Sequence, residues 1–164
     1  MNVTRPNRHT SGFTLLELMI TISIVAIFAG IGVPSFSRLI ADQRVHAAAG
    51  ELQAALWRTR AAAIHLNRDV TLVPATMDGG WESGWVAYHP TDKTRELVHA
   101  DPPRAVTVTS QISSLTYRGS GRLRGQAGTI TFEISSKRDQ GAQQRCLRID
   151  PGGQPILIRE GCSG

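Results

Sequence analysis

Charge is almost missing from one stretch near the start of the chain. Between Phe13 and Val33 the only ionisable residue is Glu17. About twenty helical residues, rising roughly 1.5 Å each, span the roughly 30 Å hydrocarbon core of a bilayer. The scarcity of charge excludes an ordinary solvent-facing helix and predicts a membrane-spanning segment.

Acidic residues are also missing before this run, where the chain carries Arg5 and Arg8. No small-x-small cleavage site follows the run before Pro34, so a secretory signal peptide is excluded. A small residue, Gly12, stands before the run instead. The positive-inside rule keeps the basic leader in the cytoplasm and places the remainder across the membrane. A plain membrane anchor is the simplest interpretation.

Glu17 argues against a plain anchor. A carboxylate inside an apolar span costs roughly 2.5–3.5 kcal/mol on insertion scales and marks a functional site by default. We therefore expect Glu17 to have a charged partner in an assembly.

Cysteine is scarce as well, and Cys146 and Cys162 are the only two. Such a pair in an exported domain indicates one disulfide, and two unpaired thiols are the alternative. The histidines stand at no metal-ligand spacing with another His, Cys or carboxylate. Phosphate-binding loops, nucleophile elbows and dinucleotide-binding loops are absent from the sequence. The sequence predicts no enzyme activity, no cofactor and no metal.

The string Gly12-Phe13-Thr14-Leu15-Leu16-Glu17 before an apolar helix resembles the type IV prepilin signal. The resemblance implies cleavage between Gly12 and Phe13 by a prepilin peptidase, then N-methylation of Phe13. It also implies that the helix packs into a filament core. The new amino group of Phe13 on a neighbouring subunit would neutralise Glu17 and fix one axial register. Processing is thus assigned to Gly12 and Phe13, and assembly to Phe13 and Glu17.

A helical pattern resumes after Pro34, which we expect to kink the helix without ending it. One long helix is predicted from Thr14 to Asn67. Its second half presents an apolar stripe to a globular domain, and Trp57 is expected in the core. The stripe consists of Leu39, Ala48, Leu52, Leu56, Ala63 and Leu66.

Short β-prone runs separated by turn formers follow from Asp69 onward. The predicted strands are Val70–Pro74, Trp85–His89, Val106–Thr109, Leu115–Arg118, Thr129–Ser135, Arg145–Ile149 and Ile156–Arg159. A helix followed by antiparallel strands predicts an α+β fold, with a sheet or β-sandwich-like domain wrapped on the helix. The expected segments are the leader 1–12, the membrane or filament-core helix 13–34, the amphipathic helix 35–67 and the β-rich domain 68–164.

The C-terminal part resembles the GspH/FimT branch of pilin-like proteins in three short stretches. These are Arg60–Asn67, Val70–Leu72 and Trp81–Val86. The resemblance implies a long helix carrying a β-sandwich-like domain. It also implies that Cys146 pairs with Cys162 in a C-terminal clamp, closing a loop of about 15 residues and stabilising by roughly 3 kcal/mol. Trp81 and Trp85 are expected in the core or at a subunit contact.

Arginines are the candidate binding residues. The formal net charge of +5 is mild, so polyanion binding has to rest on clustering. One cluster is Arg118, Arg122 and Arg124 on a glycine-rich loop, expected to be mobile, and another is Arg145, Arg148 and Arg159 around the cysteine pair. Arginines that reach successive phosphates carry affinity for DNA without sequence specificity.

A solvated turn is the simpler interpretation of the first cluster. In DNA-binding FimT-like pilins a Gly-Arg-x-Arg motif lies in the C-terminal tail. Here Gly121-Arg122-Leu123-Arg124 matches that string but lies well before Cys146, and the tail position holds Gly153–Ile156. This departure weakens the case for DNA uptake.

The resemblances together imply a minor pilin that initiates assembly at the tip of a type IV pilus. The two alternatives are a DNA-binding minor pilin for natural transformation and a GspH-like pseudopilin of type II secretion. The implied partners are other minor and major pilins, prepilin peptidase, the inner membrane and, for the DNA-binding alternative, double-stranded DNA. The chain is expected in the bacterial inner membrane with its C-terminal domain in the periplasm, and then in a pilus or pseudopilus at the cell surface.

Overall fold

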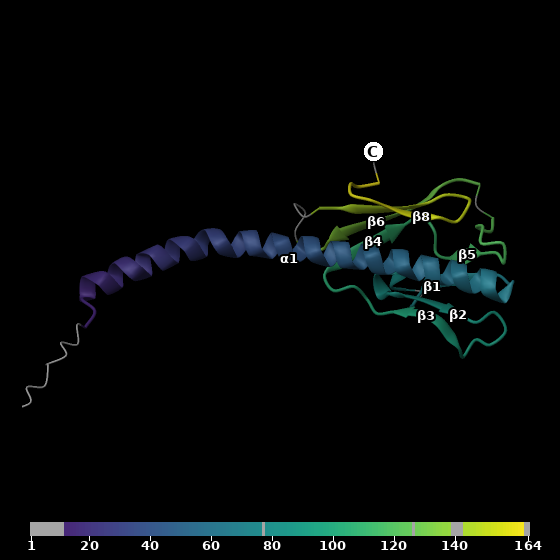
Figure 1. Ribbon diagram of the computed structural model, residues 1–164, viewed down its shortest axis with the longest axis horizontal. Helices are drawn as coiled ribbons and strands as arrows, with labels where there is room; N and C mark the ends of the chain where they lie inside the picture. The colour runs from purple at the N-terminus through teal and green to yellow at the C-terminus, as the bar shows by residue number, and fades with distance from the viewer. Residues whose placement is uncertain (1–11, 77, 126, 139–142, 163–164) are drawn as a thin grey trace, which may run out of the picture. The chain divides into compact units, whose positions relative to one another are not determined.

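The computed structural model describes residues 12–76, 78–125, 127–138 and 143–162, and only the backbone of residues 31–34. The predicted leader therefore lies outside the described residues apart from Gly12. The chain divides into two compact units, Met1–Ser37 and Arg38–Gly164. Helix α1, Leu15–Leu66, contributes residues to both units, which are described separately (Figure 1).

The ends of α1 agree with the prediction to within one residue, and α1 continues through position 34 as expected. At its C-terminus Asn67 adopts a left-handed conformation with φ of 49°. The amide of Arg68 donates to the carbonyl of Ala63, and the amide of Asn67 donates to that of Ile64. This paired pattern is a Schellman motif, and asparagine is one of the few residues that tolerate its left-handed position.

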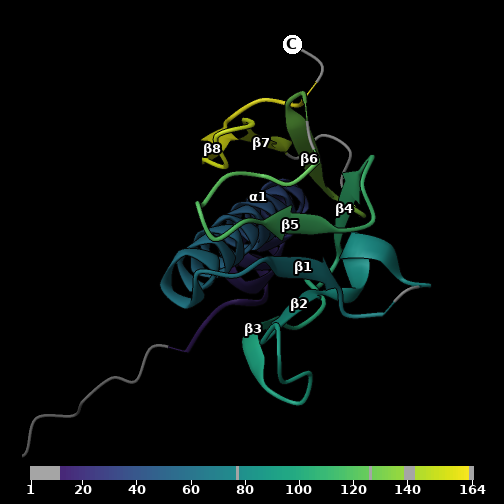
Figure 2. The same ribbon diagram turned by 90° about the vertical axis from the view of Figure 1, so that its right-hand side faces the viewer.

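Two antiparallel four-stranded sheets follow the helix in the described residues. The first has the order β3-β2-β1-β5, with β3 Glu96–Ala100, β2 Trp85–Tyr88, β1 Val70–Pro74 and β5 Leu115–Tyr117. The second has the order β4-β6-β7-β8, with β4 Val106–Ser110, β6 Ile130–Ser136, β7 Arg145–Ile149 and β8 Pro155–Ile158. Figure 2 shows the sheets on two sides of α1, which confirms the predicted α+β fold.

Strand β3 and the short 3-10 helix η1, Gly80–Ser83, are missing from the predicted elements. The strand β3 lies at a sheet edge and exposes Glu96 and His99, while its register with β2 shifts between Ala87 and Tyr88. A short edge strand with a bulge shows too little alternation to be recognised. The turn formers Asp78-Gly79-Gly80 lie at the start of η1, where the sequence indicates a turn and not a helix.

The core of the unit Arg38–Gly164 is formed by one face of α1 and the inner faces of both sheets. The buried helix residues include Ala48, Leu52, Leu56 and Ala63, as predicted, while Leu66 packs against the core only partly buried. From the sheets come Leu72, Trp85, Tyr117, Phe132, Ile134, Leu147 and Ile149.

Two predicted core residues of α1 are exposed instead. Leu39 is 52% exposed and Trp57 is 43% exposed. At about 100° per residue, Leu39 points nearly opposite to Ala48, and Trp57 lies about 140° from Leu52. Both predictions were wrong because apolar character was counted without measuring the angle around the helix.

Trp81 and Trp85 are buried, as predicted for a core position. Trp81 projects from η1, and its ring meets Phe132 of β6 edge-on with centroids 4.9 Å apart. Its indole Nε1 donates to the carbonyl of Ile112 at 2.7 Å. The residue thereby joins η1 to the second sheet.

Candidate functional site

The first turn of α1 contains Glu17, one of the two residues predicted to act in assembly, and is capped by its own sequence. Thr14 precedes the helix, and its Oγ1 accepts a hydrogen bond from the amide of Glu17 at 3.2 Å. The carbonyl of Thr14 accepts from the amide of Leu18 at 3.1 Å. A threonine followed three residues later by glutamate is the sequence pattern of a capping box, and the bond from the Glu17 amide to Thr14 is the first of its two bonds. The sequence signal for this cap is the string Thr14-Leu15-Leu16-Glu17.

Most of the described side chains in the Met1–Ser37 unit are apolar and exposed, and Glu17 is an exposed carboxylate among them. Phe13 is 83% exposed and Phe28 is 72% exposed. The hydroxyls of this stretch bond to the helix itself, because Thr21 Oγ1 donates to the carbonyl of Glu17 at 2.7 Å and Ser23 Oγ to that of Met19 at 2.8 Å. The helix α1 is long and apolar enough to cross a membrane. Internally bonded hydroxyls suit a segment surrounded by lipid.

The predicted loop around Arg118, Arg122 and Arg124 is a hydrogen-bonded turn. The amide of Arg118 donates to the carbonyl of Arg122, and the amide of Gly121 donates to that of Arg118. Leu123 is buried and bridges to Tyr117. These bonds fix the backbone between the arginines, in contrast to the mobile loop that was expected.

Arg60 of α1 fastens this turn to a second one. Its Nε donates to the carbonyl of Gly121 at 2.9 Å, and its Nη2 donates to that of Gly152 at 3.3 Å. The two acceptors belong to the turns that follow β5 and β7. Tyr117 lies buried nearby, and burial raises the pKa of its phenol. A single guanidinium thus links turns from both sheets.

The three arginines of the first cluster have different surroundings. Arg124 forms an ion pair with Asp69. Arg118 and Arg122 line one shallow hollow of about 480 Å³, together with Leu123, Gly125, Ala127 and Pro151. Only these two arginines of the cluster therefore face the same space without an acidic partner among the described residues.

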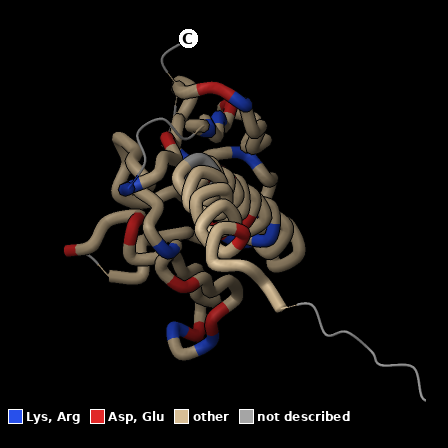
Figure 3. The backbone as a smooth tube through the Cα atoms, turned by 90° about the vertical axis from the view of Figure 1, so that its left-hand side faces the viewer, with Lys and Arg blue, Asp and Glu red and all other residues tan. Residues whose placement is uncertain are grey.

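The second predicted cluster is dispersed. Side chains alternate along a strand, so Arg145 and Arg148 of β7 project from opposite faces. Arg145 donates through Nη1 to the carbonyl of Arg159 at 2.8 Å, which places these two residues together. Figure 3 shows positive and negative positions interspersed over the unit. The structure does not bring Arg148 together with Arg145 and Arg159 as one patch.

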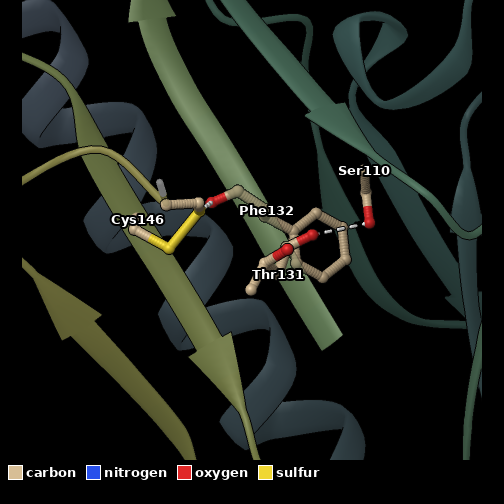
Figure 4. The surroundings of a disulfide bond; sticks show 5 residues. Ser110, Thr131, Phe132 and Cys146 are labelled. Carbon is tan, nitrogen blue, oxygen red and sulfur yellow. Dashed lines mark hydrogen bonds between the residues drawn. A yellow bond between two sulfur atoms is a disulfide. The ribbon is translucent and has the colours of Figure 1, made fainter. Parts of the chain in front are cut away.

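A disulfide joins Cys146 of β7 to Cys162, as predicted, with their Cα atoms 4.9 Å apart. Figure 4 shows it beside β6, where Cys162 Sγ lies 3.4 Å from the carbonyl oxygen of Phe132. Nearby, Ser110 Oγ donates to the carbonyl of Thr131 at 2.8 Å and ties β4 to β6. The disulfide holds the C-terminal segment against the second sheet.

Removing this disulfide lowers the free energy of unfolding by about 3 kcal/mol, because it frees a loop of about 15 residues in the unfolded chain. We expect Cys146→Ser/Cys162→Ser to show this loss in urea denaturation of the purified chain. A reductant should destabilise the wild type and leave the double variant unchanged. Equal stability of both proteins without reductant would contradict the prediction.

A metal site was not expected. Among the described residues no group of three or more His, Cys, Asp and Glu side chains is placed to hold a metal ion.

Two family models match the chain. Residues 48–153 match the family described as Type II transport protein GspH. The chain belongs to the GspH family. Residues 7–33 match the model described as Prokaryotic N-terminal methylation motif, which covers Gly12, Phe13 and Glu17. The GspH match runs from the second half of α1 into the turn that follows β7.

The solved structures that resemble this GspH-family chain include two crystal forms of the type IV minor pilin FimU of Pseudomonas aeruginosa. The form in space group P21 is 23% identical, with a TM-score of 0.60 over 71% of this chain and 89% of that chain. The form in space group P65 is also 23% identical, with a TM-score of 0.58 over 69% of this chain and 91% of that chain. No curated protein sequence matches significantly.

The GspH-family chain has the fold of a type IV minor pilin. Family and fold are those of pilins, which are structural subunits that assemble with other pilins in filaments. The methylation motif and the exposed apolar helix are consistent with a membrane anchor.

Proposed function

We propose that the chain is a minor pilin of a type IV pilus, cleaved between Gly12 and Phe13 and added at or near the tip to help initiate assembly. The observation that carries this proposal is the exposed apolar first part of α1, in which Glu17 is the one acidic residue between Phe13 and Val33 and lies within the matched methylation motif. The partners are other minor and major pilins, with prepilin peptidase acting first. The chain sits in the inner membrane before assembly, with its β-rich unit in the periplasm.

Glu17 has two tasks in this proposal. As the third residue of α1 it lies in the first turn, where the partial positive charge of the helix end stabilises a carboxylate. After cleavage the α-amino group of Phe13 on a neighbouring subunit supplies a full positive charge. In a medium of low dielectric such a pair is strongly favourable, and only one stagger between neighbouring helices brings it together.

Processing is tested by mass spectrometry of the mature chain. We expect its first residue to be N-methylated Phe13, and we expect sheared pili to contain the protein. Gly12→Ala is a mild control, whereas a bulky Gly12→Trp should block cleavage. An unprocessed chain in functional filaments would overturn the proposal.

A pseudopilin of type II secretion is the structural alternative, and the description of the matched family supports it. The likeness to FimU and the disulfide near the C-terminus support a pilus instead. Recovery of the chain from sheared pili supports the minor pilin. Recovery with the secretion machinery supports the pseudopilin.

DNA binding is a second candidate, favoured by the hollow that Arg118 and Arg122 share. Each arginine that contacts a phosphate contributes about 0.9 to the slope of log affinity against log salt. We expect Arg118→Ala/Arg122→Ala to weaken double-stranded DNA binding in a mobility shift. The slope of log affinity against log salt should become less steep by about 2. Lys93→Ala/Arg95→Ala removes two exposed cations elsewhere and is the matched control. Absence of any shift at low salt would remove this candidate.

A further inference from the structure

The bond assigned to cleavage lies just before helix α1, in backbone that is not helical. Residues 12–14 belong to no helix or strand, and α1 begins at Leu15. Phe13 is 83% exposed, and a Cβ added at Gly12 would meet no atom within 4 Å. Among the described residues, no backbone amide donates to the carbonyl of Gly12. The carbonyl of the predicted scissile bond is thus accessible in the described part of the chain.

The position at which α1 begins is set by Thr14. Its carbonyl accepts the first hydrogen bond of the helix, from the amide of Leu18 at 3.1 Å. Its Oγ1 accepts from the amide of Glu17 at 3.2 Å. An N-cap residue makes these two bonds while its own backbone stays outside the helix. Packing contributes little to this boundary, since most of the Phe13 side chain is exposed.

Without this cap, the helix would be stabilised by starting earlier. The amide of Glu17 would lose its acceptor, and an unsatisfied backbone donor is costly in an apolar environment. A start two residues earlier would give this amide the carbonyl of Phe13 as its acceptor. The amide of Leu16 would donate to the carbonyl of Gly12 in the same way. The scissile carbonyl would then be bonded inside the first turn of the helix.

Cleavage requires that the oxygen of this carbonyl can be reached. The hydroxyl of a water molecule adds to the carbonyl carbon of Gly12, the bond to the Phe13 nitrogen breaks, and that nitrogen takes up the remaining proton. Negative charge develops on the carbonyl oxygen during the addition, and a peptidase stabilises it with hydrogen-bond donors aimed at this atom. A carbonyl that already accepts from Leu16 within a helix directs its oxygen into the helix and away from those donors.

We propose that Thr14 is a positioning residue for cleavage, because by capping α1 it keeps the bond between Gly12 and Phe13 outside the helix, where the peptidase can bind it. This inference rests on the proposed function, in which a prepilin peptidase cuts that bond. Thr14 acts through the start of the helix and not through contact with the peptidase. The property of Thr14 that matters is therefore its hydrogen-bond acceptor and not its shape.

The test compares cleavage of full-length chains in detergent micelles by purified prepilin peptidase. Thr14→Val keeps the shape of threonine and removes the acceptor, whereas Thr14→Ser and Thr14→Asn keep an acceptor. We expect Thr14→Val to lower kcat/KM about fivefold, which corresponds to about 1 kcal/mol, and the other two variants to cleave like the wild type. Thr21→Val is the matched control, because it removes a hydroxyl of the same helix that donates to the carbonyl of Glu17. We expect this control to cleave like the wild type.

Two further measurements separate positioning from direct contact with the peptidase. A bonded scissile carbonyl lowers the fraction of chains that can bind, so KM of Thr14→Val should rise while kcat stays unchanged. Hydrogen exchange of the Leu16 amide should be slower in Thr14→Val than in the wild type, because this amide then donates to the carbonyl of Gly12.

Three results would overturn the inference. They are wild-type cleavage of Thr14→Val, a loss in Thr14→Asn equal to that in Thr14→Val, and unchanged exchange of the Leu16 amide. The second result would show that the peptidase reads the shape of the side chain. A wild-type chain that the peptidase leaves uncut would refute the proposed function together with this inference, so the two failures are distinguishable.

Discussion

Glu17→Ala leaves the chain cleaved and stable in the membrane but removes it from filaments. In the proposed assembly the substitution leaves the amino group of a neighbouring Phe13 without a counter-charge. An uncompensated charge in an apolar setting costs about 3–5 kcal/mol. At about 1.4 kcal/mol for each factor of ten, incorporation falls by about a hundredfold or more.

The measurement is the ratio of the protein in sheared pili to the protein in membranes. Thr21→Ala is the matched control, because it removes a polar group one turn further along the same helix, where the hydroxyl only bonds to the carbonyl of Glu17. Cleavage of both variants is checked by the mass of the mature chain. Normal incorporation of Glu17→Ala would refute the pairing.

Trp81→Ala destabilises the Arg38–Gly164 unit by about 3–5 kcal/mol, the range for emptying a large buried aromatic site. The loss has two sources. A cavity opens beside Phe132, and the carbonyl of Ile112 loses its indole donor. An acceptor that loses its donor at this part-buried position adds to the cost of the cavity.

Chemical denaturation followed by the fluorescence of Trp85 measures the change, since this residue is fully buried. Trp57→Ala is the control from the same residue type, because Trp57 lies 43% exposed on the outer side of α1. We expect its effect to be small, within about 0.5–1 kcal/mol. Similar losses for both variants would show that η1 does not anchor the second sheet.

The sequence predicts the helix and most of the strands closely because their signals are local. Helix α1 ends at Leu66, before the left-handed Asn67, and Val106–Ser110 and Ile130–Ser136 alternate buried and less buried positions as strands do. Edge strand β3 carries no such signal, since only Val98 and Ala100 are buried in it. Predictions of this kind fail where burial on one face is too sparse to leave a pattern.

The candidate sites also differ in whether their signal lies in one contiguous string or depends on contacts between distant residues. The string from Gly12 to Glu17 is contiguous, so the sequence alone points to it. The separation of Arg145 from Arg148 follows from the predicted strand, because side chains three positions apart in a strand project from opposite faces. The ion pair between Arg124 and Asp69 joins residues 55 positions apart, so it depends on tertiary structure.

The position of Arg60 has a consequence for how the chain matures. Synthesis begins at the amino terminus, so α1 is complete before any strand has emerged. The turns after β5 and β7 are fixed to each other through a side chain of this helix. The helix thus provides the apolar face on which both sheets pack. A chain without α1 would have two sheets whose inner faces lack their packing partner.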